Sequence, residues 1–521
     1  MTAPRRLLPL LVLPVLLCVP LQGAEAPRFS PGGDLVDAAT LADAELRELR
    51  RDLRDRAPAR RRSAVRRSIE RGDGAALDLV LGALADPDGM VADEAQLALG
   101  SFEFDGALER VLGRAGLRSK DPWTALRAAE ALGRWPSAVP LRSLAAALDR
   151  RRPELARALL WSIERLAAAG RLRVDERGDP WRRVASSTGR RSPDPVRAAA
   201  LSALAAAAPA RARAALEGIG RGAGPETRAA ALGLALSLDH GDASRTLVMA
   251  LGDEVPSVRA VAARLAGTHA DREVLEALVD RLELEPRPCV RDAVVRALGR
   301  ATGLKHGGHV RSWRGALGGI QESWRASAGT RAADLAALPA GQSVAALGRM
   351  DLRSDRVAIL VDFSGSLWNE RPGGGRRKDA LDPQVESLLA SLPRDAVFFL
   401  VPYTADNHPF EEEPLEAAPR AVERARRFFR QATMRGKGDV WGALELALDQ
   451  PALDRVVVVT DGAPTGGRHW DIGLIGERLW ERTRFRPVAV DLVLLDAPRR
   501  LQRRWAPVVA RLGGRLLALD R

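Results

Sequence analysis

The chain is poor in cysteine, aromatic residues and lysine. Two of its 521 residues are cysteines and 4% are aromatic, so it is not a small secreted scaffold held together by disulfides. Four of the 80 basic residues are lysines, which leaves 76 arginines. Frequent arginine and alanine are typical of a GC-rich bacterial genome, so the net charge of +13 is a weak guide to partners. The length predicts more than one domain.

One apolar run, at residues 7–21, stands near the N-terminus. It follows Arg5 and Arg6 and precedes a small-x-small sequence at residues 24–26, as in a secretory signal peptide. The run is shorter than the roughly 20 apolar residues that a membrane-spanning helix needs. We therefore predict a signal peptide over residues 1–26 and an exported protein, periplasmic or extracellular in the cell envelope, with no transmembrane segment after cleavage.

The two cysteines have different expected fates. Cys18 lies inside the apolar run and follows Leu17 rather than the small residue usual in a bacterial lipoprotein signal, which favours cleavage over a lipid anchor. Cleavage leaves Cys289 as the only cysteine, so no internal disulfide can form. Cys289 stands beside Val290 at a helix-like position, and we predict a small buried residue there rather than a nucleophile.

A repeat of about 31 residues runs through residues 60–300. Each copy reads as two amphipathic helices, which cannot bury their apolar stripes alone but form a continuous core when stacked. The pattern is similar to HEAT-type repeats and predicts an α-solenoid, with a helical lead-in over 27–59 and a helical cap and linker over 301–350. An arginine recurs at one place in each copy: Arg127, Arg157, Arg197, Arg228, Arg259 and Arg291.

The excess of positive charge lies in residues 1–350, with a net charge of +11 against +2 for residues 351–521. The recurrent arginines have two interpretations. They line a basic groove for an acidic partner, or they join neighbouring repeats through caps and ion pairs. The second is favoured, because that position commonly has this role in HEAT-type repeats. A nucleic-acid partner is not expected, because it conflicts with export.

From residue 351 to residue 521 the pattern changes to alternating strands and helices. Apolar strands are expected over 357–361, 396–403, 455–460, 489–495 and 516–519. Helices are expected over 377–392, 418–431, 440–448, 472–482 and 501–512. This alternation predicts a doubly wound α/β domain, whose ligand site lies at the carboxyl ends of the strands. The whole chain is therefore expected to be multidomain, an α-solenoid followed by an α/β domain.

Two carboxylates and two hydroxyls follow the ends of predicted strands. Asp362, Ser364 and Ser366 come at the end of the first strand, and Asp461 follows the strand over 455–460. Because the carboxyl ends of parallel strands meet at one edge, we expect these four side chains to lie close together. Their hard oxygen atoms are ligands that Mg²⁺ or Mn²⁺ prefers, and the set has no histidine or cysteine, which disfavours zinc.

Asp-x-Ser-x-Ser after a buried strand, with a later strand that ends in Asp-Gly, resembles the von Willebrand factor type A (vWA) domain and its metal-ion-dependent adhesion site. The resemblance covers residues 351–521. It implies a Rossmann-like fold and a bound Mg²⁺, or Mn²⁺ or Ca²⁺, with Ser364 and Ser366 as direct ligands. Asp362 and Asp461 would hold the ion through water, and a carboxylate from a partner would fill its open position.

One ligand of the vWA pattern is missing. The loop that usually carries a threonine reads Gly-Lys-Gly-Asp-Val-Trp here, so the position falls on Gly438, with Asp439 next to it. Either Asp439 supplies a carboxylate ligand, or the site is degraded and binds metal weakly or not at all.

Trp368 and Trp441 lie just beyond two site loops. If these side chains are exposed, they would form an aromatic rim that binds a protein partner. If they are buried, they would pack the top of the domain.

These features predict an exported, non-enzymatic binding protein of the adhesion type. The vWA-like domain would bind an exposed carboxylate of a protein partner through the cation, and the solenoid would offer an extended surface, with an acidic partner there as one alternative. A metal-free structural scaffold is the first alternative function, and the missing threonine favours it. An envelope hydrolase is the second, but the chain has no Gly-x-Ser-x-Gly elbow, and neither His408 nor His469 has an evident partner.

Overall fold

A computed structural model describes residues 38–174, 178–238, 242–326, 345–347, 350–370 and 374–519. The expected signal peptide lies outside the described residues. The chain divides into two compact units between Arg47 and Glu48, inside helix α1 (Ala38–Asp52), and the second unit holds everything discussed below. Among the described helices, none combines the length and the apolar character needed to cross a membrane.

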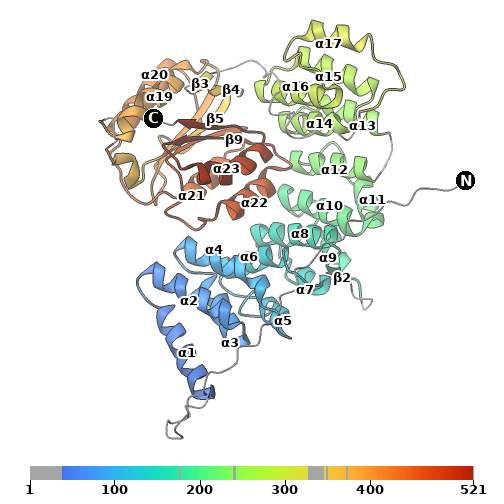
Figure 1. The fold of residues 1–521 in the computed structure, drawn as a ribbon. Coiled ribbons are helices and arrows are strands. Elements are labelled where there is room, and N and C mark those ends of the chain that lie inside the picture. The colour runs from blue at the N-terminus through green and yellow to red at the C-terminus, as the bar shows by residue number, and fades with distance from the viewer. Residues whose placement is uncertain are drawn as a thin grey trace, which may run out of the picture. The chain divides into compact units, whose positions relative to one another are not determined.

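Residues 58–317 form a helical array (Figure 1). Aspartates cap several helices: Asp73, Asp121 and Asp271, for example, each accept a hydrogen bond from a backbone N–H in the first turn. Proline opens many of the others, where its missing N–H costs nothing. The helices are α2 (Pro58–Arg71), α3 (Gly74–Ala83), α4 (Gly89–Ala98), α5 (Ala107–Leu112), α6 (Pro122–Leu132), α7 (Leu141–Ala146), α8 (Pro153–Ala168), α9 (Trp181–Ser186), α10 (Asp194–Ala207), α11 (Pro209–Glu217), α12 (Pro225–Ser237), α13 (Ala243–Leu251), α14 (Pro256–His269), α15 (Arg272–Leu284), α16 (Pro288–Thr302) and α17 (Val310–Leu317).

The even-numbered helices of the array stack in chain order. Each of α4, α6, α8, α10, α12, α14 and α16 packs on the even-numbered helix before it, and α13, α15 and α17 form part of a second layer in the same way. Stacking encloses two successive apolar cores, which meet near α12. A short parallel pair, β1 (Val139–Pro140) and β2 (Leu172–Arg173), and the 3₁₀ turn η1 (Leu99–Ser101) complete the array.

The recurrent arginines of the array make structural contacts. Arg228 pairs with Asp253 at 2.8 Å, and Arg259 pairs with the buried Glu285 at 2.7 Å. Arg291 donates to the backbone oxygen of Leu282 at 2.9 Å. These three arginines join consecutive parts of the array, in agreement with the second of the two sequence interpretations. Arg127 and Arg157 also contact the α/β domain, through the carbonyl of Arg468 and the carboxylate of Glu481.

The C-terminal part of the chain is an α/β domain with helices on both faces of a six-stranded sheet (Figure 1). The strand order is β10-β9-β8-β5-β6-β7, and every pair is parallel except β6 with the short edge strand β7. The strands are β5 (Arg356–Asp362), β6 (Val397–Tyr403), β7 (Leu415–Glu416), β8 (Arg455–Thr460), β9 (Ala489–Leu495) and β10 (Leu516–Leu519). A separate antiparallel pair, β3 (Ala345–Leu347) and β4 (Met350–Leu352), precedes them.

Two apolar cores lie on opposite faces of this sheet. Side chains of α21 (Val440–Leu448), α22 (Ile472–Thr483) and α23 (Arg499–Arg511) fill one of them. Side chains of α19 (Arg377–Ser391) and α20 (Pro419–Gln431) fill the other. The chain runs outward from β5 through β6 and then returns to β8 on the other side of β5. The carboxyl ends of β5 and β8 therefore form the topological switch point, where open α/β sheets place their ligand sites.

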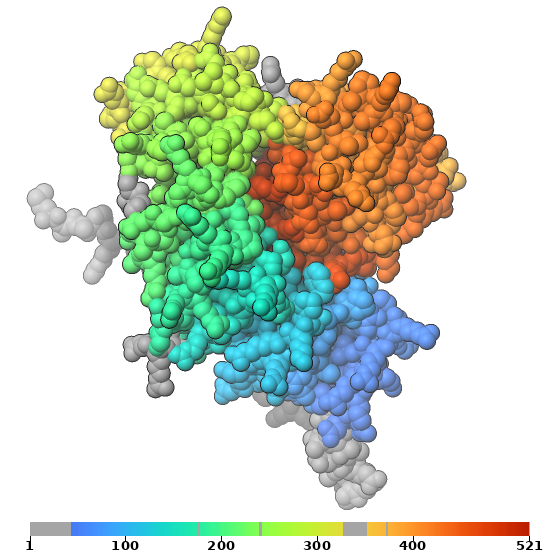
Figure 2. Space-filling model, turned by 180° about the vertical axis from the view of Figure 1, so that it is seen from behind, coloured from blue at the N-terminus to red at the C-terminus, as the bar shows by residue number. Residues whose placement is uncertain are grey.

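The α/β domain and the helical array pack together within the second compact unit (Figure 2). Helix α22 supplies much of this interface, because Glu477, Arg478 and Glu481 pair with charged residues of α6 and α8 and, just after α6, with Arg134. Closer to the array's end, Cys289 donates its thiol hydrogen to Asp454 at 2.9 Å. Burial, together with the Asp454 charge, raises the pKa of this thiol well above its usual value, so it stays protonated.

Candidate functional site

The carboxyl edge of the sheet gathers the last residues of three adjacent strands. Asp362 ends β5, Tyr403 ends β6 beside it, and Thr460 ends β8. The Asp362 side chain is 4% exposed, and its Oδ2 accepts a hydrogen bond from the Thr460 hydroxyl at 2.7 Å. Tyr403, the only tyrosine of the chain, is fully buried there. Asp362 is therefore fixed at the switch point.

Both predicted serines lie in the loop after β5. Ser364 precedes the 3₁₀ turn η2 (Gly365–Trp368), and its backbone N–H donates to Asp362 Oδ1 at 2.8 Å. The Oγ atoms of Ser364 and Ser366 are 3.0 Å apart, within hydrogen-bond distance of each other. The N–H of Gly365 donates to the carbonyl of Gly436 at 3.0 Å, which ties this loop to the one before α21.

Asp461 stands on the other side of the switch point, directly after β8. An arginine lies between it and the serine loop: Arg377 Nη1 donates to the carbonyl of Ser366 at 3.0 Å and is 3.7 Å from Asp461 Oδ2. Burial raises the pKa of the Asp362 carboxyl and the nearby Asp461 charge adds to this, while the Thr460 and Ser364 donors oppose it. We call Asp362, Ser364, Ser366 and Asp461 the aspartate–serine site.

Gly438 and Asp439 occupy the loop where the vWA pattern has its threonine. A Cβ atom on Gly438 would lie 2.9 Å from Asp362 Oδ1, so the backbone approaches the carboxylate closely and presents no side-chain oxygen. Asp439 caps α21 instead of turning to the serines, because its Oδ1 accepts from the N–H of Gly442 at 2.8 Å. None of the contacts in the described part of the chain joins the Asp439 carboxylate to the aspartate–serine site.

The chemistry of the aspartate–serine site fits a small divalent cation. Two carboxylates and two converging hydroxyls are hard oxygen donors, as Mg²⁺ requires. Two features act against tight binding: Gly438 adds no oxygen, and Arg377 already places one positive charge beside Asp461. In the ranges that the structure describes, no group of three or more His, Cys, Asp and Glu side chains is arranged to hold a metal.

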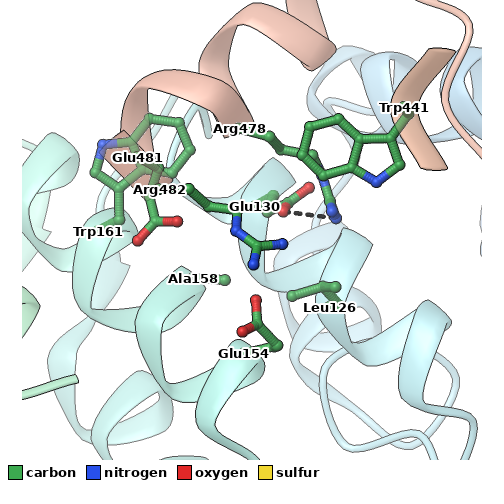
Figure 3. Close-up of a pocket in the computed structure, with 9 residues that line it drawn as sticks. All are labelled: Leu126, Glu130, Glu154, Ala158, Trp161, Trp441, Arg478, Glu481 and Arg482. Atoms are coloured by element: carbon green, nitrogen blue, oxygen red, sulfur yellow. Dashed lines mark ion pairs between the residues drawn. The ribbon is translucent and has the colours of Figure 1, made fainter. Parts of the chain in front are cut away.

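The two tryptophans predicted for the rim have different environments. Trp368 ends η2 and is half-buried beside the serine loop. Trp441 is 1% exposed, which agrees with the buried one of its two predicted roles and excludes it from a partner-binding rim. It points from α21 into the interface with the array, next to a cavity of about 20 Å³ whose far wall includes Glu130 and Glu154 (Figure 3). Such a cavity has room for about one water molecule.

His469 has a partner that sequence reasoning missed. Its Nδ1 lies 3.0 Å from Oδ1 of Asp93 on α4, and the same oxygen accepts from Arg127 Nη1 at 2.7 Å. Asp93 Oδ2 accepts from the backbone N–H groups of Trp470 and Asp471 at 2.6 and 2.7 Å. His469 is fully buried, so this pair holds the α/β domain against the array and does not face a substrate.

Sequence reasoning also missed three residues of the site itself. Tyr403 and Thr460 are the last residues of predicted strands, so their place at the same edge as Asp362 was implicit in the pattern. Arg377 begins a predicted helix, and only the folded turn brings it to Asp461. Of the predicted residues, Asp362, Ser364 and Ser366 contact one another. Asp461 acts on Asp362 through its charge and lies 3.7 Å from Arg377, whereas Asp439 caps a helix.

Comparisons with known proteins give only weak matches to solved structures. No protein-family model and no curated sequence matches the chain. Among solved structures, the conserved hypothetical protein BatB from Bacteroides thetaiotaomicron is similar at 16% identity and a TM-score of 0.24, over 32% of this chain and 90% of BatB. A von Willebrand factor type A protein from Catenulispora acidiphila is similar at 17% identity and a TM-score of 0.27, over 33% of this chain and 40% of that one.

A third similar structure is human deoxyhypusine hydroxylase, at 22% identity and a TM-score of 0.22, over 50% of this chain and 97% of the hydroxylase. Identities and scores this low establish neither a family nor an activity. The fold assignment therefore rests on the helices and strands described above: a helical region followed by an α/β domain.

Proposed function

We propose that this chain is a non-enzymatic binding protein whose aspartate–serine site holds Mg²⁺ and, through it, a carboxylate of a protein partner. The observation that carries the proposal is the convergence of Asp362, Ser364 and Ser366 at the switch point, with the two serine Oγ atoms 3.0 Å apart. The resemblance of this motif to the vWA adhesion site supports the same function. Mn²⁺ and Ca²⁺ are alternative ions.

Each residue has a distinct part in this proposal. Ser364 and Ser366 would contact the ion through Oγ, and Asp362 and Asp461 would hold it through water. When bound, the ion supplies the positive charge that attracts a partner's carboxylate. Burial of Asp362 strengthens the attraction between the charges at this site, because charge–charge attraction is stronger where water is excluded. The helical array would support the domain and extend the surface that partners meet.

Calorimetric titration of the full mature chain with Mg²⁺, Mn²⁺ and Ca²⁺ tests the proposal. The full chain is needed because the α/β domain buries charged residues against the array, and an isolated domain would expose them. Asp362→Asn and Ser366→Ala should each weaken binding at least tenfold, since each removes a donor or a charge. Asp395→Asn is the matched control, because Asp395 is exposed in the same domain.

Two results would contradict the proposal. The first is the absence of any binding heat from the unmutated chain while circular dichroism shows that it is folded. The second is equal binding by the unmutated chain and Ser366→Ala, which would place the ion elsewhere. If binding is found, capture of an acidic protein partner should fail in EDTA.

A metal-free scaffold is the second candidate function, and specific observations favour it. Gly438 stands where a ligand is expected, and the Arg377 guanidinium contacts both the serine loop and the neighbourhood of Asp461. In that case Arg377 supplies the positive charge that the two aspartates need. Partner capture that is equal with Mg²⁺ and with EDTA would support this function.

We also propose export to the cell envelope, on the strength of the signal-like sequence at residues 1–26. Fusion of residues 1–40 to a reporter that is active only outside the cytoplasm tests it. Activity of the reporter supports export, and activity lost when Arg5 and Arg6 are replaced by Asp would attribute it to this segment.

A further inference from the structure

Three cations surround the ring of Trp368 beside the aspartate–serine site. The guanidinium carbon of Arg435 is 4.4 Å from the ring centroid, and that of Arg376 is 5.7 Å from it. The Lys378 ammonium is 5.9 Å from the same ring. Cations are drawn to the face of an indole by its negative quadrupole, so the ring holds these side chains in place. Trp368 is only two residues from Ser366 in η2.

The cations around Trp368 differ in how well their charge is neutralised. Lys378 is buried and pairs with Asp382 at 2.6 Å, so its charge is satisfied within the fold. Arg376 is about half exposed and lies 3.5 Å from the equally exposed Asp379. Arg435 is exposed and has no ion pair with any residue that the structure describes. We call Arg376 and Arg435, held on the Trp368 ring, the cationic rim.

The cationic rim is suited to bind anions from solvent. The two guanidinium groups near this ring carry like charges, and an anion bound beside them reduces their repulsion. Arginine presents parallel N–H donors that match the two oxygens of a carboxylate. Stacking on Trp368 keeps these donors oriented, so less side-chain freedom is lost when an anion binds. The cationic rim thus offers a preorganised site for a second negative group, next to the partner carboxylate at the aspartate–serine site.

We propose that the cationic rim binds a further carboxylate of the same partner, so that the partner presents an acidic segment rather than a single acidic residue. This inference rests on the proposed function, which brings one partner carboxylate to the aspartate–serine site. The Cα atoms of Ser366 and Trp368 are at most about 7 Å apart, given the reach of two residues. Side chains at i and i+2 of an extended strand share one face and have a similar separation.

The simplest partner sequence that presents two neighbouring carboxylates on one face of an extended segment is Glu-x-Glu or Asp-x-Asp. Protein carboxylates are favoured over lipid or nucleic-acid phosphates for one reason. A polypeptide that places one carboxylate at the aspartate–serine site necessarily brings its own neighbouring side chains to the rim. One carboxylate would reach the ion beside Ser366, and the other would pair with Arg376 and Arg435.

Fluorescence anisotropy with the full chain and two labelled peptides tests this inference. One peptide is Gly-Glu-Gly-Glu-Gly and the other is Gly-Glu-Gly-Gln-Gly, each measured with Mg²⁺ and with EDTA. With Mg²⁺ the first should bind more tightly. In the double variant Arg376→Gln/Arg435→Gln its affinity should fall about threefold to tenfold, the size expected for two exposed ion pairs. The affinity of the second peptide should not change.

Arg427→Gln is the control for charge. Arg427 is exposed on α20 and lies two residues from the buried Phe429, so it points to a different side of that helix from the core. This variant should bind both peptides as the unmutated chain does. Thermal melting of each variant checks that the fold is intact.

The outcomes separate this inference from the proposed function. Mg²⁺-dependent binding of both peptides with equal affinity, unchanged in the double variant, overturns the rim and leaves the proposed function in place. Binding in EDTA that the double variant loses supports the rim and contradicts the metal-dependent function. No binding of either peptide at about millimolar concentration overturns the inference. Preferential binding of the chain to phosphatidylglycerol vesicles would also overturn the inference, if the double variant loses that binding.

Discussion

Gly438 shows how a single residue limits what the aspartate–serine site can hold. Its N–H donates to the Thr465 hydroxyl at 2.8 Å, and the space where its Cβ would be is filled by the Asp362 carboxylate. The loop therefore approaches Asp362 more closely than any other residue type would allow. The same closeness leaves the site without the threonine oxygen that the vWA pattern leads us to expect.

Restoring the threonine should not restore a stronger metal site. In Gly438→Thr the added Cβ would start 2.9 Å from Asp362 Oδ1, so the carboxylate or the loop must move. We expect no gain in Mg²⁺ affinity by calorimetry. Stability should fall by about 1–3 kcal/mol, the usual cost of overpacking. Gly438→Ala is the control, since it adds the Cβ without the hydroxyl and should lose similar stability. A tenfold gain in affinity for threonine alone would show that the loop adapts.

At the scale of single residues, the sequence predicted contacts between residues that are close in the chain and missed contacts between residues that are far apart in it. Asp362, Ser364 and Ser366 lie within five positions of one another, so their proximity follows from the strand and turn alone. Asp93 and His469 are 376 positions apart, and no periodicity links them. Trp441 was left undecided between exposed and buried, because the neighbour that buries it belongs to another part of the chain.

At the scale of elements, helix α21 explains the role of Asp439. A helix needs acceptors for its first N–H groups, and Asp439 supplies one through Gly442. Burial raises the pKa of the Asp439 carboxyl, and its bond to that N–H works against the rise. Gly467 leaves room for this carboxylate: it has φ +77°, and a Cβ there would lie 1.9 Å from Asp439 Oδ1.

Substitution of Asp439 separates the cap from a metal ligand. Asp439→Ala should lower the free energy of unfolding by about 1 kcal/mol, because the cap is lost. Asp439→Asn should keep most of that stability, since asparagine caps helices about as well. Neither change should weaken Mg²⁺ binding by more than about twofold. Urea unfolding and calorimetry measure the two effects. Loss of Mg²⁺ binding in Asp439→Asn, with stability retained, would instead make Asp439 the substitute ligand.

The elements of the α/β domain were predictable for a clear reason. Between their polar end residues, strands such as Arg356–Asp362 and Arg455–Thr460 are apolar, which is typical of strands buried on both faces. The short edge strand Leu415–Glu416 was not predicted, because two residues carry no periodic pattern. In the helical array, the repeat indicated stacked helix pairs, but it gave no sign that α22 of the other domain would pack on them.

At the scale of the whole second unit, buried charges join the helical array to the α/β domain. Burial alone would raise the pKa of Asp93, but its bonds to His469, Arg127 and two backbone N–H groups lower it to about 2. Burial, with the charges of Arg478 and Arg127, holds the pKa of His469 well below its usual value, although Asp93 opposes this. Near neutral pH, therefore, an ionised Asp93 accepts from a neutral His469.

This buried histidine gives stability a defined dependence on pH. The unfolded chain binds a proton to His469 near pH 6.5, whereas the folded chain does not until the pH is much lower. As the pH falls below about 6.5, the free energy of unfolding should drop by up to about 1.4 kcal/mol per pH unit from this group. Asp93 contributes in a separate window, because its stabilisation is lost only as the pH falls from about 4 toward 2.

His469→Asn should remove the histidine contribution while keeping a donor near the position of Nδ1. At pH 7.5 the variant should unfold at a lower temperature than the unmutated chain, because the imidazole packing against Trp441 is lost. Between pH 7.5 and pH 5.5 its melting temperature should fall less than that of the unmutated chain. Scanning calorimetry at the two pH values measures both effects.

The matched control is His269→Asn, since His269 is exposed on α14 and lies outside the buried contact with Asp93. It should show the full decrease between pH 7.5 and 5.5. An equal decrease in His469→Asn would mean that His469 already takes up a proton in the folded state. Asp93 would then form a true ion pair with it, and the contact between the array and the α/β domain would gain charge attraction as the pH falls.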